Sequence, residues 1–397
     1  MGLTFSQLAL MYRNELLKSV IPFWAGYSID REYGGFLTCL DRRGNVYDTD
    51  KFIWLQGRQV WVFSKFYDSL ERNREWLDIA LHGSALLEKH GRDTLGNWYF
   101  SLDRKGDPLL APYNIFSDCF AAMAFGQLSA ATGNDRYADV AVKTYDNILR
   151  RFDNPKGKLN KAILTTRRLK GFSLPMILCN LSLEIEHLLG KDLIETTIGR
   201  CIHELMDVFY DEGTGVIREN VNADGSFSDT FEGRLINPGH GIEAMWFIMD
   251  LAERNKDRSL AAKAAKIALD ILNYSWDSEY GGIYYFLDIK GKPVQQLEWD
   301  QKLWWVHAET LISLLKGYYY TKNTECLKWF YRVHEYTWSH FPDNEYGEWF
   351  GYLNRAGEVL IPLKGGKWKG CFHIPRALYQ CFKVLEKLDA GNCESVL

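Results

Sequence analysis

A motif of roughly 60 residues recurs along the chain and constrains its fold more than any other feature. Each copy opens with an aspartate, runs through a short aromatic segment and ends at a turn that contains a glycine. The interval from aspartate to glycine is 13 or 14 residues in five copies, which begin at Asp30, Asp93, Asp211, Asp277 and Asp343. A degenerate copy from Asp153 fills the remaining gap, so that successive copies start 58 to 66 residues apart. The chain is therefore predicted to contain six structural repeats.

Each repeat predicts a β-hairpin followed by two helices. The turn glycine supplies the positive φ that a tight turn requires. After the hairpin, apolar residues recur with helical spacing in two segments, as in residues 116–131 and 134–151. The first segment of a pair is apolar on most faces and the second is amphipathic, which is the pattern of a buried inner helix with an outer helix beside it.

The N-terminal segment completes this arrangement. Residues 5–20 have helical spacing and precede the first hairpin, so they supply the missing outer partner of the last inner helix. We therefore predict an all-α fold, an (α/α)6 barrel of six inner and six outer helices, with short β-hairpins at one end. Residues 1–397 are expected to form a single catalytic domain. An open helical solenoid is the alternative, but the N-terminal helix favours closure.

Composition excludes several classes of protein. The chain has 397 residues with 47 basic and 51 acidic side chains, a net charge of −4, which argues against a nucleic-acid partner. No apolar run is long enough to span a membrane. Eight cysteines are scattered without a Cys-x-x-Cys pair, which argues against a zinc knuckle and fits reduced thiols in the cytoplasm. The aromatic content, 15%, suits either a large core or platforms for sugar rings.

Three of the nine histidines occupy equivalent positions in their repeats. Aligned on the turn glycine, four side chains lie 14 to 16 residues beyond it, at the start of an inner helix: Arg58, His240, His307 and His373. In a closed barrel these helix starts surround one cavity, so we expect the four to contact a substrate there. Charged groups close to them in sequence, or on the preceding hairpin, are further candidates: Glu219, Glu243, Glu309 and Arg376.

Imidazoles on opposite sides of a pocket suit the transfer of a proton to and from carbon near neutral pH. A metal site is disfavoured because the helical His-x-x-x-His spacing of zinc proteases is absent. Nucleophilic hydrolysis is disfavoured because no Gly-x-Ser-x-Gly motif is present. Glycoside hydrolysis by paired carboxylates remains open, with Glu219 as its candidate residue. A protein that only binds and sequesters a partner, such as a protease, also remains open.

The degenerate third repeat carries a run of positive charge. Between Arg150 and Lys170 there are eight basic residues and one acidic residue, a local balance of +7. A solvated face would explain such a run, but the segment NPKGKLNK joins a glycine to closely spaced lysines that can bind polyphosphate. Because the Walker A pattern is absent, we expect a bound nucleotide to act as an effector. The candidate ligands are Lys156, Gly157, Lys158 and Lys161.

Five long segments resemble the N-acyl-D-glucosamine 2-epimerase family, also called the renin-binding-protein family. They are residues 51–61, 112–125, 234–247, 296–309 and 364–379. The resemblance implies an α6/α6 barrel, usually a homodimer, that interconverts N-acetylglucosamine and N-acetylmannosamine. It also implies ATP as an allosteric activator that is not consumed, and no required metal.

The same resemblance implies roles for individual residues. It makes His240 and His373 the catalytic pair and places the nucleotide loop in the basic third repeat. The substrate-site groups that it implies are Arg58, Glu219, Glu243, Glu309 and Arg376. The near alternative on the same fold is a 2-epimerase or aldose–ketose isomerase of unsubstituted sugars, which needs no nucleotide.

Overall fold

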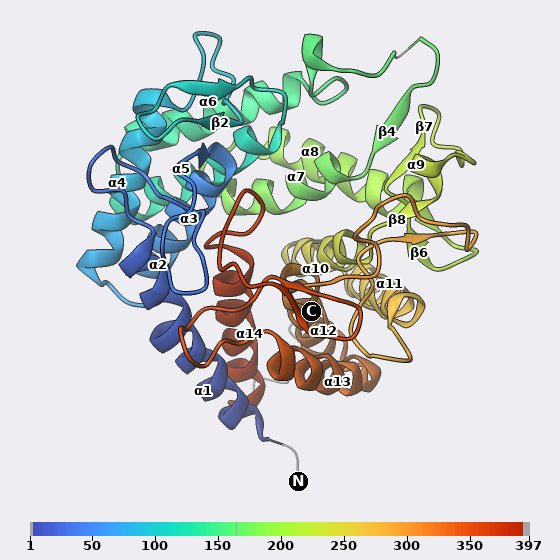
Figure 1. Cartoon of the computed structure of the whole chain (residues 1–397). Helices are drawn as coiled ribbons and strands as arrows, with labels where there is room; N and C mark the ends of the chain where they lie inside the picture. The colour runs from blue at the N-terminus through green and yellow to red at the C-terminus, as the bar shows by residue number, and fades with distance from the viewer. Residues whose placement is uncertain (1–2, 164, 392–397) are drawn as a thin grey trace.

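The structure is a computed structural model that describes residues 3–163 and 165–391. Six helices form an inner ring: α3 (Ile53–Ser69), α5 (Phe116–Thr132), α7 (Ser173–Glu184), α10 (Pro238–Asn255), α12 (Trp304–Thr321) and α14 (His373–Asp389). Six lie outside them: α1 (Phe5–Glu15), α4 (Arg74–His90), α6 (Asp135–Arg150), α8 (Lys191–His203), α11 (Arg258–Ser275) and α13 (Thr324–His340). The helix pairs follow one another around a closed ring (Figure 1).

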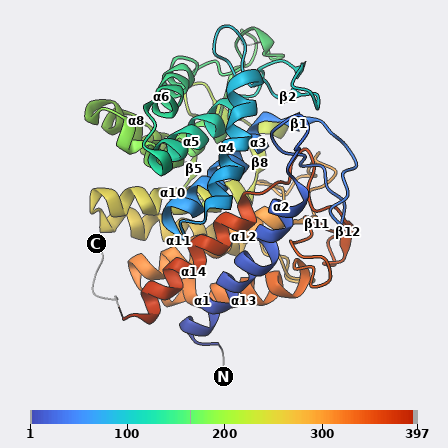
Figure 2. The same ribbon diagram turned by 90° about the vertical axis from the view of Figure 1, so that its left-hand side faces the viewer.

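Contacts between the first and last inner helices close this ring. Successive inner helices contact one another from α3 through α5, α7, α10 and α12 to α14. At the closing position, the Tyr379 ring of α14 lies 5.3 Å from the Phe66 ring of α3, and its hydroxyl donates to Ser69 Oγ at 3.0 Å. Helix α1 packs along α14 (Figure 2). The predicted (α/α)6 barrel, completed by the N-terminal helix, is confirmed.

Burial separates the inner from the outer helices as the sequence pattern predicts. In α5, every residue from Ser117 to Ser129 is buried. In α6, the buried residues follow one stripe with helical spacing, from Val140 to Ile148. Five of the outer helices begin at a side chain that accepts a hydrogen bond from a backbone N–H two or three residues later, which stabilises the helix start. These capping residues are Thr4, Asn73, Asn134, Asp257 and Asn323.

The hairpins form short antiparallel strands at one end of the barrel, where β1, β2, β11 and β12 gather in Figure 2. The strands are β1 (Lys51–Phe52), β2 (Ser101–Leu102), β3 (Pro108–Leu110), β4 (Leu169–Gly171), β5 (Tyr210–Asp211), β6 (Val216–Ile217), β7 (Asn220–Asn222), β8 (Leu235–Ile236), β9 (Leu287–Asp288), β10 (Lys302–Leu303), β11 (Tyr352–Leu353) and β12 (Val359–Ile361). The five predicted turn glycines have φ between 66° and 103°, as expected: Gly44, Gly106, Gly225, Gly291 and Gly357.

Short helical segments complete the chain: the π-helical turns Leu16–Val20 and Glu204–Val208, the 3-10 turns Gly157–Leu159 and Glu186–Leu188, and the helices α2 (Ile21–Tyr27) and α9 (Phe231–Arg234). Within the described part of the chain, no helix has both the length and the hydropathy needed to cross a bilayer. The seven cysteines that the structure describes are free and buried, and Cys393 lies outside the described residues.

Buried ion pairs hold the hairpins on the barrel. The opening aspartates of the first, fifth and sixth repeats each pair with a lysine that lies before the next inner helix: Asp30–Lys51 at 3.0 Å, Asp277–Lys302 at 3.0 Å and Asp343–Lys364 at 2.9 Å. Each aspartate also binds an arginine of the following repeat: Arg104 on Asp30, Arg355 on Asp277 and Arg42 on Asp343. Because Arg42 belongs to the first repeat and Asp343 to the last, this pair closes the ring at the hairpin end.

Candidate active site

A cavity of about 570 Å³, the barrel cavity, lies at the hairpin end where the inner helices begin. Each inner helix contributes a lining residue from its first turn: Trp54, Phe116, Ser173, His240, Trp304 and His373. The N-terminus of a helix carries partial positive charge from its unpaired N–H groups. Six such ends around one space therefore favour negative charge that develops inside it.

His240 lies at the third position of α10, which Asn237 caps by accepting from the His240 backbone N–H at 3.2 Å. Its ring Nδ1 lies 3.0 Å from Glu219 Oε1. Burial favours the neutral ring, but the Glu219 carboxylate outweighs it and raises the pKa of His240 above the ordinary value. Glu219 thus lines the cavity and also holds this imidazole.

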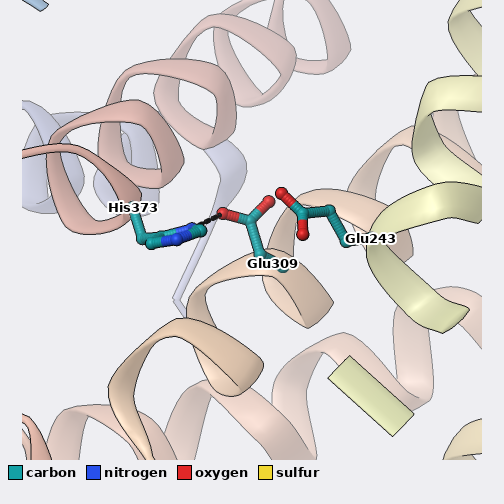
Figure 3. Close-up of side chains that lie close together, drawn as sticks. All are labelled: Glu243, Glu309 and His373. Atoms are coloured by element: carbon teal, nitrogen blue, oxygen red, sulfur yellow. Dashed lines mark hydrogen bonds and ion pairs between the residues drawn. The ribbon is translucent and has the colours of Figure 1, made fainter. Parts of the chain in front are cut away.

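His373 is the first residue of α14, and its Nδ1 lies 2.7 Å from Glu309 Oε1 (Figure 3). Burial, followed by the positive charge of Arg58, lowers the pKa of His373 well below its usual range. The same Glu309 oxygen accepts from Arg376 Nη2 at 2.7 Å, and Glu309 Oε2 accepts from Trp246 Nε1 at 3.0 Å. Two cations and an indole therefore share one buried carboxylate when His373 is protonated.

The two histidines belong to one site. The Trp305 ring contacts both imidazoles, with centroid distances of 5.2 Å to His240 and 5.7 Å to His373. Both histidines and Trp305 line the barrel cavity. Among the described residues, none hydrogen-bonds Nε2 of either ring, although both Nδ1 atoms are engaged. Each ring therefore has its Nε2 available to a molecule in the cavity.

Arg58 provides a fixed positive charge on the cavity wall. Its Cζ lies 4.0 Å from the Phe120 ring centroid, 4.5 Å from that of Trp54 and 4.8 Å from that of Phe372. Burial lowers the pKa of Arg58 to about 9, so the guanidinium remains charged at neutral pH. No described carboxylate lies within ion-pair distance of it, and its Nε is buried without a partner. This cation is placed to bind an oxygen of a substrate.

The remaining predicted substrate-site groups lie at two depths. Glu243 lines the barrel cavity, whereas Glu309 and Arg376 are buried and do not line it. Glu309 contacts His373, and Arg376 contacts Glu243. Glu243, Glu309 and His373 offer ligand atoms within 4.8 Å of one another (Figure 3), a spacing that suits a metal ion. However, the Arg376 guanidinium donates to both carboxylates, which balances the charge that would attract a cation.

The structure corrects the assignment of His307 as a substrate-binding residue. The ring is fully buried and does not line the cavity. Its Nε2 accepts from the Ile283 backbone N–H at 3.1 Å, and its Nδ1 lies 2.8 Å from the Leu303 carbonyl oxygen. Burial lowers the pKa of His307 to about 3, so the ring stays neutral. The repeat brings it to an equivalent position in sequence, but its rotation on α12 directs it to the hairpin backbone.

A second cavity of about 710 Å³, the basic cavity, lies under the degenerate third repeat. Of the four predicted nucleotide ligands, Lys156 lines it, whereas Gly157, Lys158 and Lys161 are exposed and do not. Other side chains of the basic run and two aromatic rings also line it: Arg167, Arg168, Lys170, Tyr113 and Phe152. The charge run indicated this region, but only the folded loop shows which cations face inward.

The repeat alignment does not single out several lining residues of the barrel cavity. They are Asn114, Met176, Ile177, Tyr285, Glu298 and Gln301. Most lie on irregular segments or on the wall formed by the third repeat, where the repeat alignment is weakest. Residues 296–309, one of the segments on which the family resemblance rests, include Glu298 and Gln301.

Comparison with known proteins agrees with this geometry. The sequence model of the N-acylglucosamine 2-epimerase family matches residues 35–377. The chain is 40% identical to the mouse N-acylglucosamine 2-epimerase and 39% identical to the human one, covering 94% of this chain and 90% and 89% of those proteins. A solved cellobiose 2-epimerase from Bacillus thermoamylovorans B4167 shows the same fold, with a TM-score of 0.83, 22% identity and coverage of 95% and 99%. The chain therefore belongs to the N-acylglucosamine 2-epimerase family and is an isomerase.

Proposed function

We propose that this chain interconverts N-acetyl-D-glucosamine and N-acetyl-D-mannosamine by moving a proton at C2 of the ring-opened sugar, with His240 and His373 as the two acid–base groups. One observation carries the proposal. Two histidines line a single cavity next to Trp305, each with Nδ1 held by a carboxylate and Nε2 unpaired among the described residues.

The chemistry requires groups of this kind. Opening of the sugar ring makes C1 an aldehyde, and the C2 hydrogen next to it becomes acidic. One imidazole Nε2 takes that proton, the electrons of the C2–H bond form a C1–C2 double bond, and negative charge collects on the C1 oxygen. The second imidazole then donates its Nε2 proton to the opposite face of C2, the carbonyl re-forms and the configuration is inverted.

The two environments suit complementary roles. The lowered pKa of His373 keeps its ring neutral, and donation of Nδ1–H to Glu309 leaves the Nε2 lone pair free to act as a base. The raised pKa of His240 favours the protonated ring, which can supply a proton. Each forward turnover leaves His373 protonated and His240 neutral, which is the state from which the reverse reaction starts. Before the next forward turnover His373 must therefore lose a proton to solvent and His240 must regain one.

The negative charge that develops on the C1 oxygen needs a partner. Arg58 is the buried cation that faces the cavity without a carboxylate of its own among the described residues. The six helix N-termini add partial positive charge. Stabilising such an oxyanion is commonly worth about 10²–10³-fold in rate for a single donor.

Exchange with heavy water tests the proton transfer. The wild-type chain incubated with N-acetylglucosamine in D2O should yield N-acetylmannosamine that carries deuterium at C2, observed by NMR. His240→Asn and His373→Asn should each abolish the interconversion, whereas His90→Asn, on outer helix α4, should not. Product without deuterium at C2 contradicts the mechanism. Turnover of glucose but not of N-acetylglucosamine indicates an epimerase of unsubstituted sugars instead.

We further propose that ATP binds in the basic cavity and raises the activity without being consumed. Several observations support this: Lys156, Arg167, Arg168 and Lys170 line the cavity, and the Tyr113 and Phe152 rings offer surfaces for a base. Initial rates with ATP and with a non-hydrolysable analogue should rise equally. Lys156→Met should raise the ATP concentration needed, while Lys143→Met, an exposed lysine on α6, should not. Activity that is indifferent to ATP contradicts this part of the proposal.

A further inference from the structure

The barrel cavity and the basic cavity share a wall. Asn114, Phe116 and Ser173 line both of them. Side chains that border the sugar site are therefore also in contact with the space beneath the third repeat. At these three positions a single layer of residues separates the two cavities.

A two-stranded ladder leads from the basic cavity toward His240. Strand β4 lies beside β7 (Figure 1) and pairs with it in antiparallel orientation. In this pairing Gly171 lies opposite Asn220. Gly171 and Asn220 both line the basic cavity. One residue beyond the ladder, the Phe172 backbone N–H donates to the Glu219 carbonyl oxygen at 2.9 Å. The backbone of Glu219 is therefore tied directly to the end of β4.

Neighbouring residues at the start of β7 face different cavities. Glu219 lines the barrel cavity and Asn220 lines the basic cavity, because side chains in extended backbone alternate between faces. The Asn220 side-chain amide donates to the Glu232 carbonyl oxygen at 3.0 Å. The Glu219 carboxylate lies 3.0 Å from His240 Nδ1. A movement of this backbone acts on the catalytic imidazole through a single side chain.

We propose that the β4–β7 ladder transmits occupancy of the basic cavity to His240, with Glu219 as the positioning residue that receives it. The inference rests on the proposed binding of a nucleotide polyphosphate in the basic cavity. A polyanion held there by Lys170 and its basic neighbours fixes β4. The ladder to β4, together with the Asn220 amide that anchors β7 to the Glu232 carbonyl oxygen, fixes the backbone of Glu219. The carboxylate then holds His240 with Nε2 toward the substrate. Because His240 acts on the reacting carbon, activation should appear mainly in kcat rather than in KM.

The first experiment compares two asparagines on the same strand. Asn220→Ala removes the side chain that faces the basic cavity. Asn222→Ala is the matched control, because the Asn222 side-chain amide donates to Ser226 and Phe227 of its own turn while the backbone stays in the same ladder. ATP affinity is measured by calorimetry and kcat with and without ATP. Allosteric coupling typically amounts to about 5–150-fold, and Asn220→Ala should lose most of this activation while still binding ATP. Asn222→Ala should respond as the wild type does.

A spectroscopic measurement tests the role of Glu219 separately. In protein with isotope-labelled histidine, ATP should shift the ring resonances of His240, assigned with His240→Asn. The shift should disappear in Glu219→Gln although that variant still binds ATP. No shift in the wild type, or the same shift in Glu219→Gln, overturns the inference, and so does full activation of Asn220→Ala. If Asn220→Ala no longer binds ATP, the resonances of the wild type and Glu219→Gln decide.

These outcomes separate the coupling from the proposed effector. A wild-type chain that neither binds ATP nor is activated by it refutes the effector, and the coupling with it. A wild-type chain that is activated by ATP while the His240 resonances stay unchanged refutes only the coupling. Epimerisation itself is measured in the same samples without ATP, so its absence is recognised independently.

Discussion

Replacing Glu309 by glutamine tests whether the buried carboxylate behind His373 sustains catalysis. Glu309 accepts from three donors: His373 Nδ1 and Arg376 Nη2 on one oxygen, and Trp246 Nε1 on the other. Glutamine has the same shape but offers one acceptor oxygen and one donor amide. Whichever way the amide is turned, at least one buried donor loses its acceptor, which costs about 1–3 kcal/mol of folding free energy.

The effect on catalysis depends on the tautomer of His373. If the NH2 of the glutamine side chain faces Nδ1, it donates a hydrogen bond to that nitrogen. The ring proton then moves to Nε2, and Nε2 has no lone pair left to take the C2 proton. If the amide oxygen faces Nδ1, the tautomer is kept, but the negative charge that supports a protonated ring is lost. We therefore expect a decrease of about 10²–10⁴-fold in the rate, the usual contribution of a general base.

The measurement is the rate of hydrogen exchange at C2 of N-acetylglucosamine in D2O, followed by proton NMR. Guanidinium unfolding of the same preparation shows whether the variant is folded. Glu253→Gln is the matched control, because this carboxylate is also on an inner helix and also accepts a hydrogen bond, from Tyr320 at 2.6 Å, but at the far end of α10. A folded Glu309→Gln variant that exchanges C2 hydrogen at the wild-type rate would refute the reasoning.

Three further predictions follow from the same structure. As the pH increases, kcat/KM should rise through the lowered pKa of His373, which lies below 6.5, and then fall through the raised pKa of His240, which lies above 6.5. A profile that lacks either the rise or the fall contradicts the paired roles of the two histidines. Burial opposes ionisation of Asp30, but Arg104 and Lys51 outweigh it and lower the pKa of this carboxyl to about 2. The ionised Asp30 therefore stabilises the fold fully above pH 3.8, and this contribution is lost as the pH falls toward 2. Asp30→Asn should lower the free energy of urea unfolding at pH 7 by about 3–5 kcal/mol, because a buried lysine loses its partner; an unchanged value argues against a structural role. Gly57→Ala should destabilise the barrel by about 1–3 kcal/mol, because the new Cβ would lie 2.7 Å from the Phe120 carbonyl oxygen where α3 meets α5. An unchanged melting temperature would show that the two helices move apart at little cost.

The repeat pattern was sufficient to predict the fold. Hydrophobic spacing reports on which face of a helix is buried, and six equivalent copies with an N-terminal partner leave few arrangements other than a ring. Capping residues such as Asn73 and turn glycines such as Gly44 act within a few residues of chain, so their effects are also local. The repeat alignment also placed His240 and His373 at the cavity correctly, because each lies at the start of an inner helix, at a nearly constant interval after its turn glycine.

Only the tertiary structure decided what each of these side chains does. His307 occupies the same position in its repeat as His373, yet its ring bonds the backbone at Ile283 and Leu303, whereas His373 faces the cavity. That difference arises from side-chain packing between helices, which one-dimensional spacing does not record. The carboxylates that bind His240 and His373 lie 21 and 64 residues away from them along the chain. Distances between such groups are set when the ring closes, and their protonation depends on burial that exists only in the folded barrel.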